Sequence, residues 1–136
     1  LFSFHGVPKR YVREGDPYRQ HCEATTAAVV QALNLPAERY QLVYQSRFGK
    51  EPWLQPYADE TIRALAEAGC DSVSVICPGF TADCLETLEE MAMTNRSLFL
   101  QHGGTHYDYI PALNDDPAHI ELLADLVAAH TQGWVG

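Results

Sequence analysis

The stretch VSVICPGFTADCLETLEE (residues 73–90) decides how this sequence folds. Its first five residues form a short apolar run that is typical of a buried strand. Pro78 and Gly79 interrupt that run, and a helical pattern begins near Thr81 or Asp83. Open α/β sheets bind their ligands just beyond the carboxyl ends of their strands. The start of this helix is therefore a candidate position for a functional site.

The predicted helix separates apolar residues from acidic ones. At about 100° per residue, the side that faces the sheet contains Cys84, Leu85, Leu88, Met91 and Ala92. On the other side, Asp83, Glu86 and Glu90 stack at i, i+3 and i+7, and Glu89 lies in the same arc. These acids have two interpretations. They either are solvated residues that cap the helix and complement its dipole, or they form a carboxylate stripe that serves a binding site.

Length and composition limit the classes of protein to consider. The 136 residues, of which 46% are hydrophobic, suffice for one domain with a substantial core. The net charge of −9 argues against a nucleic-acid partner, which needs a basic surface, and agrees better with a cation or a small molecule. Apolar runs stay well short of the roughly 18 residues of a membrane span, so we expect neither a transmembrane segment nor a signal peptide.

The four cysteines do not form a metal-binding motif. Cys22, Cys70, Cys77 and Cys84 include no CxxC pair, so their spacing predicts neither a zinc site nor an iron–sulfur cluster. Cys77 falls in the predicted strand, and Cys84 on the apolar side of the predicted helix. We therefore expect reduced, buried thiols and a cytoplasmic protein.

Strand and helix patterns alternate along the rest of the chain. The predicted strands are residues 1–4, 40–45, 73–77 and 98–101, with 107–110 as a further extended segment. The other predicted helices run from Asp16 to Asn34, from Asp59 to Gly69 and from Asp116 to His130. The inward residues are Cys22, Thr25, Thr26, Val29, Val30 and Leu33 in the first of these helices, and Ile120, Leu123, Ala124 and Val127 in the last. This alternation predicts an α/β fold, in which helices cover both faces of a parallel four-stranded sheet.

Three separated motifs resemble the ferrochelatases of bacterial type, enzymes that insert ferrous iron into a porphyrin. The motifs are SFHGVP (residues 3–8), QSRFG with PWL (residues 45–49 and 52–54) and PGFTADCLETLEE (residues 78–90). They occur in the family's order, and the resemblance covers nearly the whole chain. It implies the three-layer, flavodoxin-like chelatase fold. It also implies that residues 1–136 are the C-terminal lobe of a two-lobed enzyme whose N-terminal lobe this sequence lacks.

The resemblance implies roles for particular residues. It makes His5 and Glu86 the catalytic pair, which also binds the metal, whereas the residues alone leave His5 open as a loop histidine without a role. The sequence leaves open which of the two accepts protons. Asp83 and Glu90 would extend an acidic path for metal entry or proton exit. Thr94 stands where some relatives continue that acidic row, so the path is shorter or differently built here.

The resemblance also places the porphyrin against Arg47, Trp53 and Phe80. An aromatic wall suits a flat macrocycle, because ring stacking adds about 0.5–1.5 kcal/mol to the burial of area. Arg47 and Lys50 could meet propionates, Arg47 as a fork. The alternative for Trp53 is a structural role, in which its ring caps the core.

The implied reaction joins ferrous iron and protoporphyrin IX into haem, without a permanently bound cofactor or an iron–sulfur cluster. Two alternatives stay open. A related chelatase would act on coproporphyrin or a sirohydrochlorin. A non-enzymatic flavodoxin-like module would bind a cofactor and would need a phosphate-binding loop after the first strand, which HGVPKR (residues 5–10) does not resemble.

Overall fold

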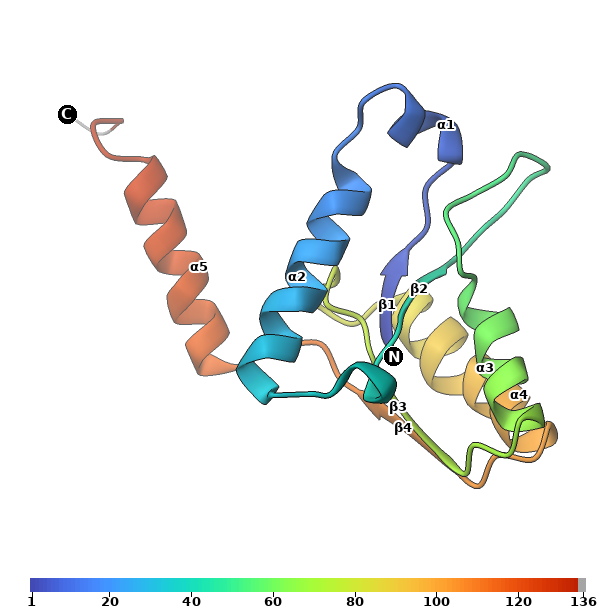
Figure 1. The fold of residues 1–136 in the computed structure, drawn as a ribbon. Coiled ribbons are helices and arrows are strands. Elements are labelled where there is room, and N and C mark those ends of the chain that lie inside the picture. The colour runs from blue at the N-terminus through green and yellow to red at the C-terminus, as the bar shows by residue number, and fades with distance from the viewer. Residues whose placement is uncertain (135–136) are drawn as a thin grey trace.

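The computed structural model of the protein describes residues 1–134. Within this range the strands are β1 (Phe2–His5), β2 (Leu42–Gln45), β3 (Ser72–Ile76) and β4 (His106–Ile110). The helices are α1 (Lys9–Arg13), α2 (Tyr18–Leu33), α3 (Ala58–Glu67), α4 (Arg96–Gln101) and α5 (Pro117–His130), with the short 3₁₀ helix η1 (Ala37–Arg39) and the π-helix η2 (Glu86–Asn95). The strands pair in parallel in the order β2-β1-β3-β4 (Figure 1). The predicted parallel four-stranded sheet is confirmed.

Helices cover both faces of this sheet, as predicted. Successive residues of a strand point to opposite faces, so each strand can contribute side chains to a core on either side. On one face, Phe2 and Phe4 of β1 pack with Cys22 of α2. The opposite face packs against α3, η2 and α4. The buried residues of that second core include Val43, Ile62, Val75, Met91 and Phe99. The chain therefore forms a three-layer α/β fold with a core on each side of the sheet.

The acid-bearing helix η2 winds as a π-helix and begins at Glu86, later than the predicted start near Thr81 or Asp83. Hydrogen bonds from i to i+5 widen each turn of such a helix. Its buried residues, Thr87, Met91 and Asn95, consequently recur at every fourth position. Residues 81–84 form the turn that leads from β3 into this helix.

The predicted apolar side of this helix is partly wrong. Leu85 is 73% exposed and Leu88 is 48% exposed, although both were expected to face the sheet. The later start and the wider winding rotate these two residues toward solvent. Met91 is fully buried, as expected.

The predicted strand at Leu98–Gln101 is also wrong. These residues belong to α4, which continues directly from η2. A short apolar run fits a strand or a helix equally well, and here continuity with the preceding helix decides the outcome. The fourth strand is β4, predicted only as an additional extended segment, and it pairs with β3 along its whole length.

Helix α5 has its predicted start but not its predicted burial. Asp116 caps it by accepting a hydrogen bond from the Ala118 N–H, and Pro117 occupies the first turn. Figure 1 shows α5 extending away from the sheet. Because the helix does not lie on the sheet, the side chains expected to be buried are exposed, namely Ile120, Leu123, Ala124 and Val127.

Smaller differences concern α2 and α3. Cys22 and Thr26 are the buried residues of α2, whereas Thr25 and Leu33 are exposed, because only a narrow stripe of this helix contacts the sheet. Asp59 does not cap α3, which begins one residue earlier, at Ala58.

We expect Met91→Ala to lower the free energy of unfolding by about 2–5 kcal/mol, because truncation leaves a cavity in the core beneath η2. Met91 is 0% exposed, whereas Met93 is 64% exposed. Met93→Ala should therefore change the stability by less than about 0.5 kcal/mol. Urea denaturation followed by circular dichroism measures both variants. Equal losses would contradict the inward orientation of Met91.

Candidate active site

His5 lies at the carboxyl end of β1, in register with Gln45 at the end of β2. The residue is half-buried, and its Nδ1 lies 2.7 Å from the carbonyl oxygen of Gly6. When Nδ1 carries the proton it donates to that carbonyl, and the Nε2 lone pair is available to a metal or a proton. The Trp53 ring lies 6.2 Å from the His5 ring. The absence of a side chain at Gly6 lets the Trp53 ring pack against the backbone next to His5, because a Cβ on residue 6 would lie 3.0 Å from that ring.

Glu86 is the first residue of η2, beyond the carboxyl end of β3. The Cys84 thiol donates a hydrogen bond to its Oε2 at 3.1 Å. This hydrogen bond, a backbone N–H and the nearby His5 imidazole lower the pKa of the Glu86 carboxyl from its usual value. His5 ends β1 and Glu86 follows the parallel neighbour β3, so the two predicted catalytic residues lie beyond the carboxyl ends of paired strands, at the same edge of the sheet.

Gln45 is a buried polar residue beneath this edge, and the analysis of the sequence assigned it no role. Its Oε1 accepts hydrogen bonds from the Ser3 hydroxyl at 2.7 Å and the Cys77 thiol at 3.3 Å. Its Nε2 donates to the carbonyl of Glu86 at 2.7 Å. Burial raises the pKa of Cys77 to about 12, so that thiol stays protonated. The sequence does contain a signal for this role, because Gln45 ends an apolar strand. A buried amide at such a position requires hydrogen-bond partners.

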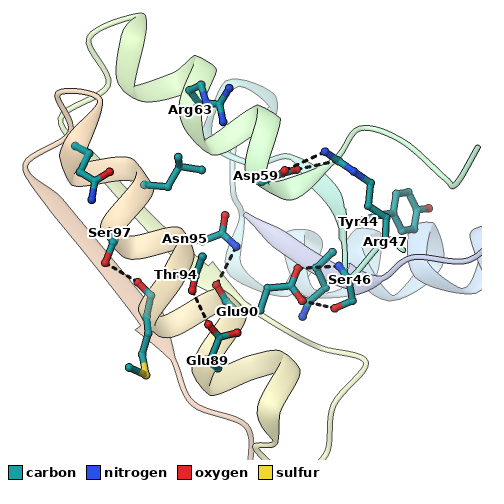
Figure 2. A pocket seen from close by; sticks show the side chains of 14 residues that line it. Tyr44, Ser46, Arg47, Asp59, Arg63, Glu89, Glu90, Thr94, Asn95 and Ser97 are labelled. Carbon is teal, nitrogen blue, oxygen red and sulfur yellow. Dashed lines mark hydrogen bonds and ion pairs between the residues drawn. The ribbon is translucent and has the colours of Figure 1, made fainter. Parts of the chain in front are cut away.

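Glu90 follows Glu86 along η2 and is held by Ser46. The Ser46 backbone N–H donates to Oε1 of Glu90 at 2.8 Å, and the Ser46 hydroxyl donates to Oε2. Ser46 has φ = 65°, a left-handed backbone conformation that is uncommon for residues other than glycine. Figure 2 shows this pair at a pocket between η2 and the start of α3.

The pocket has a volume of about 680 Å³, and charged side chains of both signs are part of its lining. Its charged and hydroxyl-bearing residues include Ser46, Arg47, Asp59 and Arg63 on one side, and Glu89, Glu90, Thr94 and Ser97 on the other (Figure 2). The Thr94 hydroxyl donates to Glu89 at 2.7 Å. Thr94 therefore engages a neighbouring glutamate at the rim of the pocket.

Asp83 lies in the turn before η2, so the prediction that it shares a helical stripe with the two glutamates is wrong. Its carboxylate accepts hydrogen bonds from the side chains of Thr87 at 2.9 Å, Tyr109 at 2.7 Å and Asn114 at 2.9 Å. Burial alone would raise the pKa of Asp83, but the hydrogen bonds from these three side chains outweigh it and lower the pKa. The carboxylate is thus fully engaged within the protein.

Arg47, predicted to face the porphyrin, is paired within the chain. Its guanidinium donates to both carboxylate oxygens of Asp59, at 2.9 and 3.0 Å. It also lies 3.9 Å from the centre of the Tyr57 ring. This ion pair is partly exposed, so a competing carboxylate could exchange with Asp59 at little cost.

The predicted aromatic residues are mostly buried. Trp53 is 6% exposed and caps the core, as the structural alternative for this residue anticipated. Phe80 is half-buried and packs against the core of α3 and η2. Phe48, which received no individual role, is 72% exposed, and its ring lies 4.8 Å from that of Trp53. The exposed aromatic surface of this loop therefore belongs to Phe48.

Within residues 1–134, no group of three or more His, Cys, Asp or Glu side chains is arranged to hold a metal ion. The four cysteines are free thiols. Among the described helices, none has the length and apolar character needed to cross a membrane.

Comparison with known proteins identifies relatives of the chain. The family model for ferrochelatase matches residues 1–131. The chain is 58% identical over 134 residues to the ferrochelatase of Nitrosococcus oceani, which covers 98% of this chain and 36% of that protein. It is 63% identical over 129 residues to the ferrochelatase of Edwardsiella ictaluri, and the match covers 95% of this chain and 40% of that protein. A ferrochelatase of Escherichia coli is 56% identical over 130 residues, and the match covers 96% of this chain and 41% of that protein. The chain thus spans 36–41% of the length of these curated relatives.

We expect Gln45→Met to lower the free energy of unfolding by about 1–3 kcal/mol, because a thioether of similar length leaves buried polar partners without hydrogen bonds. Gln45 is 2% exposed, whereas Gln41 is exposed. Gln41→Met should therefore change the stability by less than about 0.5 kcal/mol. Differential scanning calorimetry compares the two. An unchanged melting temperature for Gln45→Met would show that its hydrogen bonds contribute nothing net.

Proposed function

The chain belongs to the ferrochelatase family, and on that basis we propose that it is the part of a ferrochelatase that carries the reacting side chains. The proposed enzyme inserts ferrous iron into protoporphyrin IX and releases haem. The observation that carries the proposal is the position of His5 and Glu86 at one edge of the sheet, beyond the carboxyl ends of the paired strands β1 and β3. An imidazole and a carboxylate are both metal ligands and proton acceptors.

The proposed enzyme is longer than this chain, which would be its C-terminal lobe. The chain covers only 36–41% of each matched ferrochelatase, which supports a longer polypeptide, and its assignment to the C-terminal lobe rests on the resemblance of its motifs. The remaining N-terminal lobe would supply the opposite wall of the porphyrin site. Porphyrin and ferrous iron are substrates in this proposal, and the reaction needs no resident cofactor. The free thiols favour a reducing compartment, the cytoplasm.

The chemistry exchanges two pyrrole protons for one Fe²⁺ ion, so the site has to accept protons and help the ion to lose water. His5 can contribute Nε2, because its Nδ1 faces the Gly6 carbonyl. Glu86 can contribute an ionised carboxylate, because its pKa is lowered. The pair then lies at the centre of the macrocycle, where one group takes iron while the other takes a proton.

Glu90 is the next acid along η2, and we assign it to the transfer of protons or iron between Glu86 and the polar pocket. Its carboxylate meets the Ser46 hydroxyl and lies at that pocket, which supports a connection to solvent. Asp83 suits a different role. Its carboxylate already accepts three side-chain hydrogen bonds, so it supports the turn before η2 rather than extending the path.

Of the residues on the porphyrin side, some would contact the porphyrin and others would support the residues that do. The exposed Phe48 ring is the surface that would stack on the macrocycle, with the buried Trp53 behind it. Arg47 would pair with a propionate by exchanging its partly exposed partner Asp59. Phe80 would fix the turn before η2 from the core side. Rigid support of this kind favours a bent, metal-accepting ring over a flat one.

We expect the 136-residue chain to fold on its own but not to insert iron. Each face of its sheet has a packed core, whereas the porphyrin needs a second wall. Circular dichroism tests the fold, and haem absorbance after addition of porphyrin and Fe²⁺ under anaerobic conditions tests the reaction. The complete polypeptide is the positive control. Steady haem formation by the chain alone would overturn the need for a second lobe.

In the complete polypeptide, Glu86→Gln should lose nearly all turnover, because an amide neither accepts the proton nor binds iron as a carboxylate does. Glu89→Gln should keep most of it, since Glu89 is exposed and its carboxylate accepts a hydrogen bond from the Thr94 hydroxyl. Both variants should stay within about 1 kcal/mol of the parent in stability. Porphyrin binding, followed by fluorescence quenching, should persist in both. Similar turnover in the two variants would mean that Glu86 is a solvated residue without a catalytic role.

A further inference from the structure

We propose that Asn114 is a positioning residue for Glu86, an inference that rests on the proposed function of that glutamate. Asn114 lies between β4 and α5 and has a left-handed backbone with φ = 48°. It acts on Glu86 through the turn formed by residues 81–84.

Asn114 holds this turn by its backbone and by both ends of its amide. Its N–H donates to the carbonyl of Thr81 at 3.0 Å. Its Oδ1 accepts from the backbone N–H of Asp83 at 2.8 Å, and its Nδ2 donates to Oδ2 of Asp83 at 2.9 Å. One side chain therefore binds both the backbone and the carboxylate of Asp83.

Further hydrogen bonds connect Asp83 to the candidate active site. Oδ1 of Asp83 accepts a hydrogen bond from the Thr87 hydroxyl at 2.9 Å. The Thr87 hydroxyl accepts one from the Cys84 N–H, also at 2.9 Å. The Cys84 thiol donates to the Glu86 carboxylate at 3.1 Å. An unbroken series of hydrogen bonds thus connects Asn114 to the carboxylate that the proposed reaction uses.

The turn depends on such external contacts because residues 81–84 belong to no helix or strand. Thr81 and Ala82 are exposed, so core packing does not fix them. Reacting groups lose rate steeply when displaced, by up to about 100-fold for about 1 Å. A loosened turn would therefore impair turnover more than it would impair folding.

Asn114 is itself fixed by the first turn of α5. Its carbonyl oxygen lies 2.8 Å from Nδ1 of His119, a side chain that is 7% exposed. The Asp116 N–H donates to the carbonyl of Leu113 at 3.0 Å. The residues that position Glu86 thus include the start of the last helix, far from η2 in the sequence.

The test uses Asn114→Gly in the complete polypeptide, because glycine retains the left-handed backbone and removes only the amide. The matched control is Asn34→Gly, at the end of α2, where φ is 51° and the hydrogen bonds of the cap come from the backbone. Asn114→Gly should lower kcat for haem formation about tenfold. It should leave KM for porphyrin within about twofold of the parent value. The control should change neither constant.

A double variant separates positioning from a general loss of structure. Glu86→Asp already displaces the carboxylate, so adding Asn114→Gly should cost less than about twofold more in kcat. A full tenfold loss in that background would overturn the proposal. If Asn114→Gly fails to fold, Asn114→Asp replaces it, since it keeps the acceptor for the Asp83 N–H and loses the donor to its carboxylate. Unchanged kcat in Asn114→Asp would likewise overturn the proposal.

Hydrogen exchange distinguishes failure of this inference from failure of the proposed function. Asn114→Gly should speed amide exchange in peptides that cover residues 81–87, whereas Asn34→Gly should affect only the end of α2. If the parent forms no haem, the proposed function fails, and the exchange data alone decide whether Asn114 holds the turn. Unchanged exchange at residues 81–87 would overturn the inference in an active or an inactive parent.

Discussion

The amide of Gln45 joins the sheet to the acid-bearing helix, and the geometry of the candidate site depends on that junction. Its Oε1 accepts hydrogen bonds from Ser3 on β1 and from Cys77 beyond β3, while its Nε2 binds the carbonyl of Glu86. A buried amide that lost these partners would cost about 1–3 kcal/mol for each unpaired group, so the three elements adopt one arrangement together. His5 ends the neighbouring strand β1, in register with Gln45, and so lies at the same edge of the sheet. Gln45 therefore fixes the backbone of Glu86 relative to the strand ends, one of which carries His5, although Gln45 itself need not touch substrate.

The π winding of η2 has a related cause. Wide turns pack less well than those of an α-helix, and π segments occur where other interactions compensate. In η2 the carbonyls of Glu86 and Glu90 each accept a side-chain amide, from Gln45 and Asn95. Thr87, Met91 and Asn95 turn toward the core at four-residue spacing. Because residues four apart are neighbours on a helix, Glu86 and Glu90 follow one another along the surface.

Parts of this structure were predictable from the sequence for physical reasons. Runs such as Val73-Ser74-Val75 between turn residues predict strands, and Asp116-Pro117 predicts a helix start, because each signal is local. Leu98–Gln101 was mispredicted because a run of three apolar residues and a glutamine is too short to have a period of its own. The placement of Leu88 failed because an α-helical period was applied to a π-helix. His5 and Glu86 came from motif resemblance, whereas Gln45 and Asn114 act through contacts between distant segments that no local pattern encodes.

Three acids near one another in the sequence have three different environments, and these suggest how their roles divide. Asp83 accepts hydrogen bonds from three side chains, so its charged form is stabilised and its lone pairs are occupied. Glu90 is held by the N–H and hydroxyl of Ser46. Among residues 1–134, Glu86 has only the Cys84 thiol as a side-chain donor, and a thiol is a weak donor that a cation or a pyrrole N–H can displace. Catalysis in the proposed reaction requires a carboxylate that is oriented yet easily released from its partner. Of the three acids, Glu86 alone combines those two properties, and its neighbours supply the rigidity that it lacks.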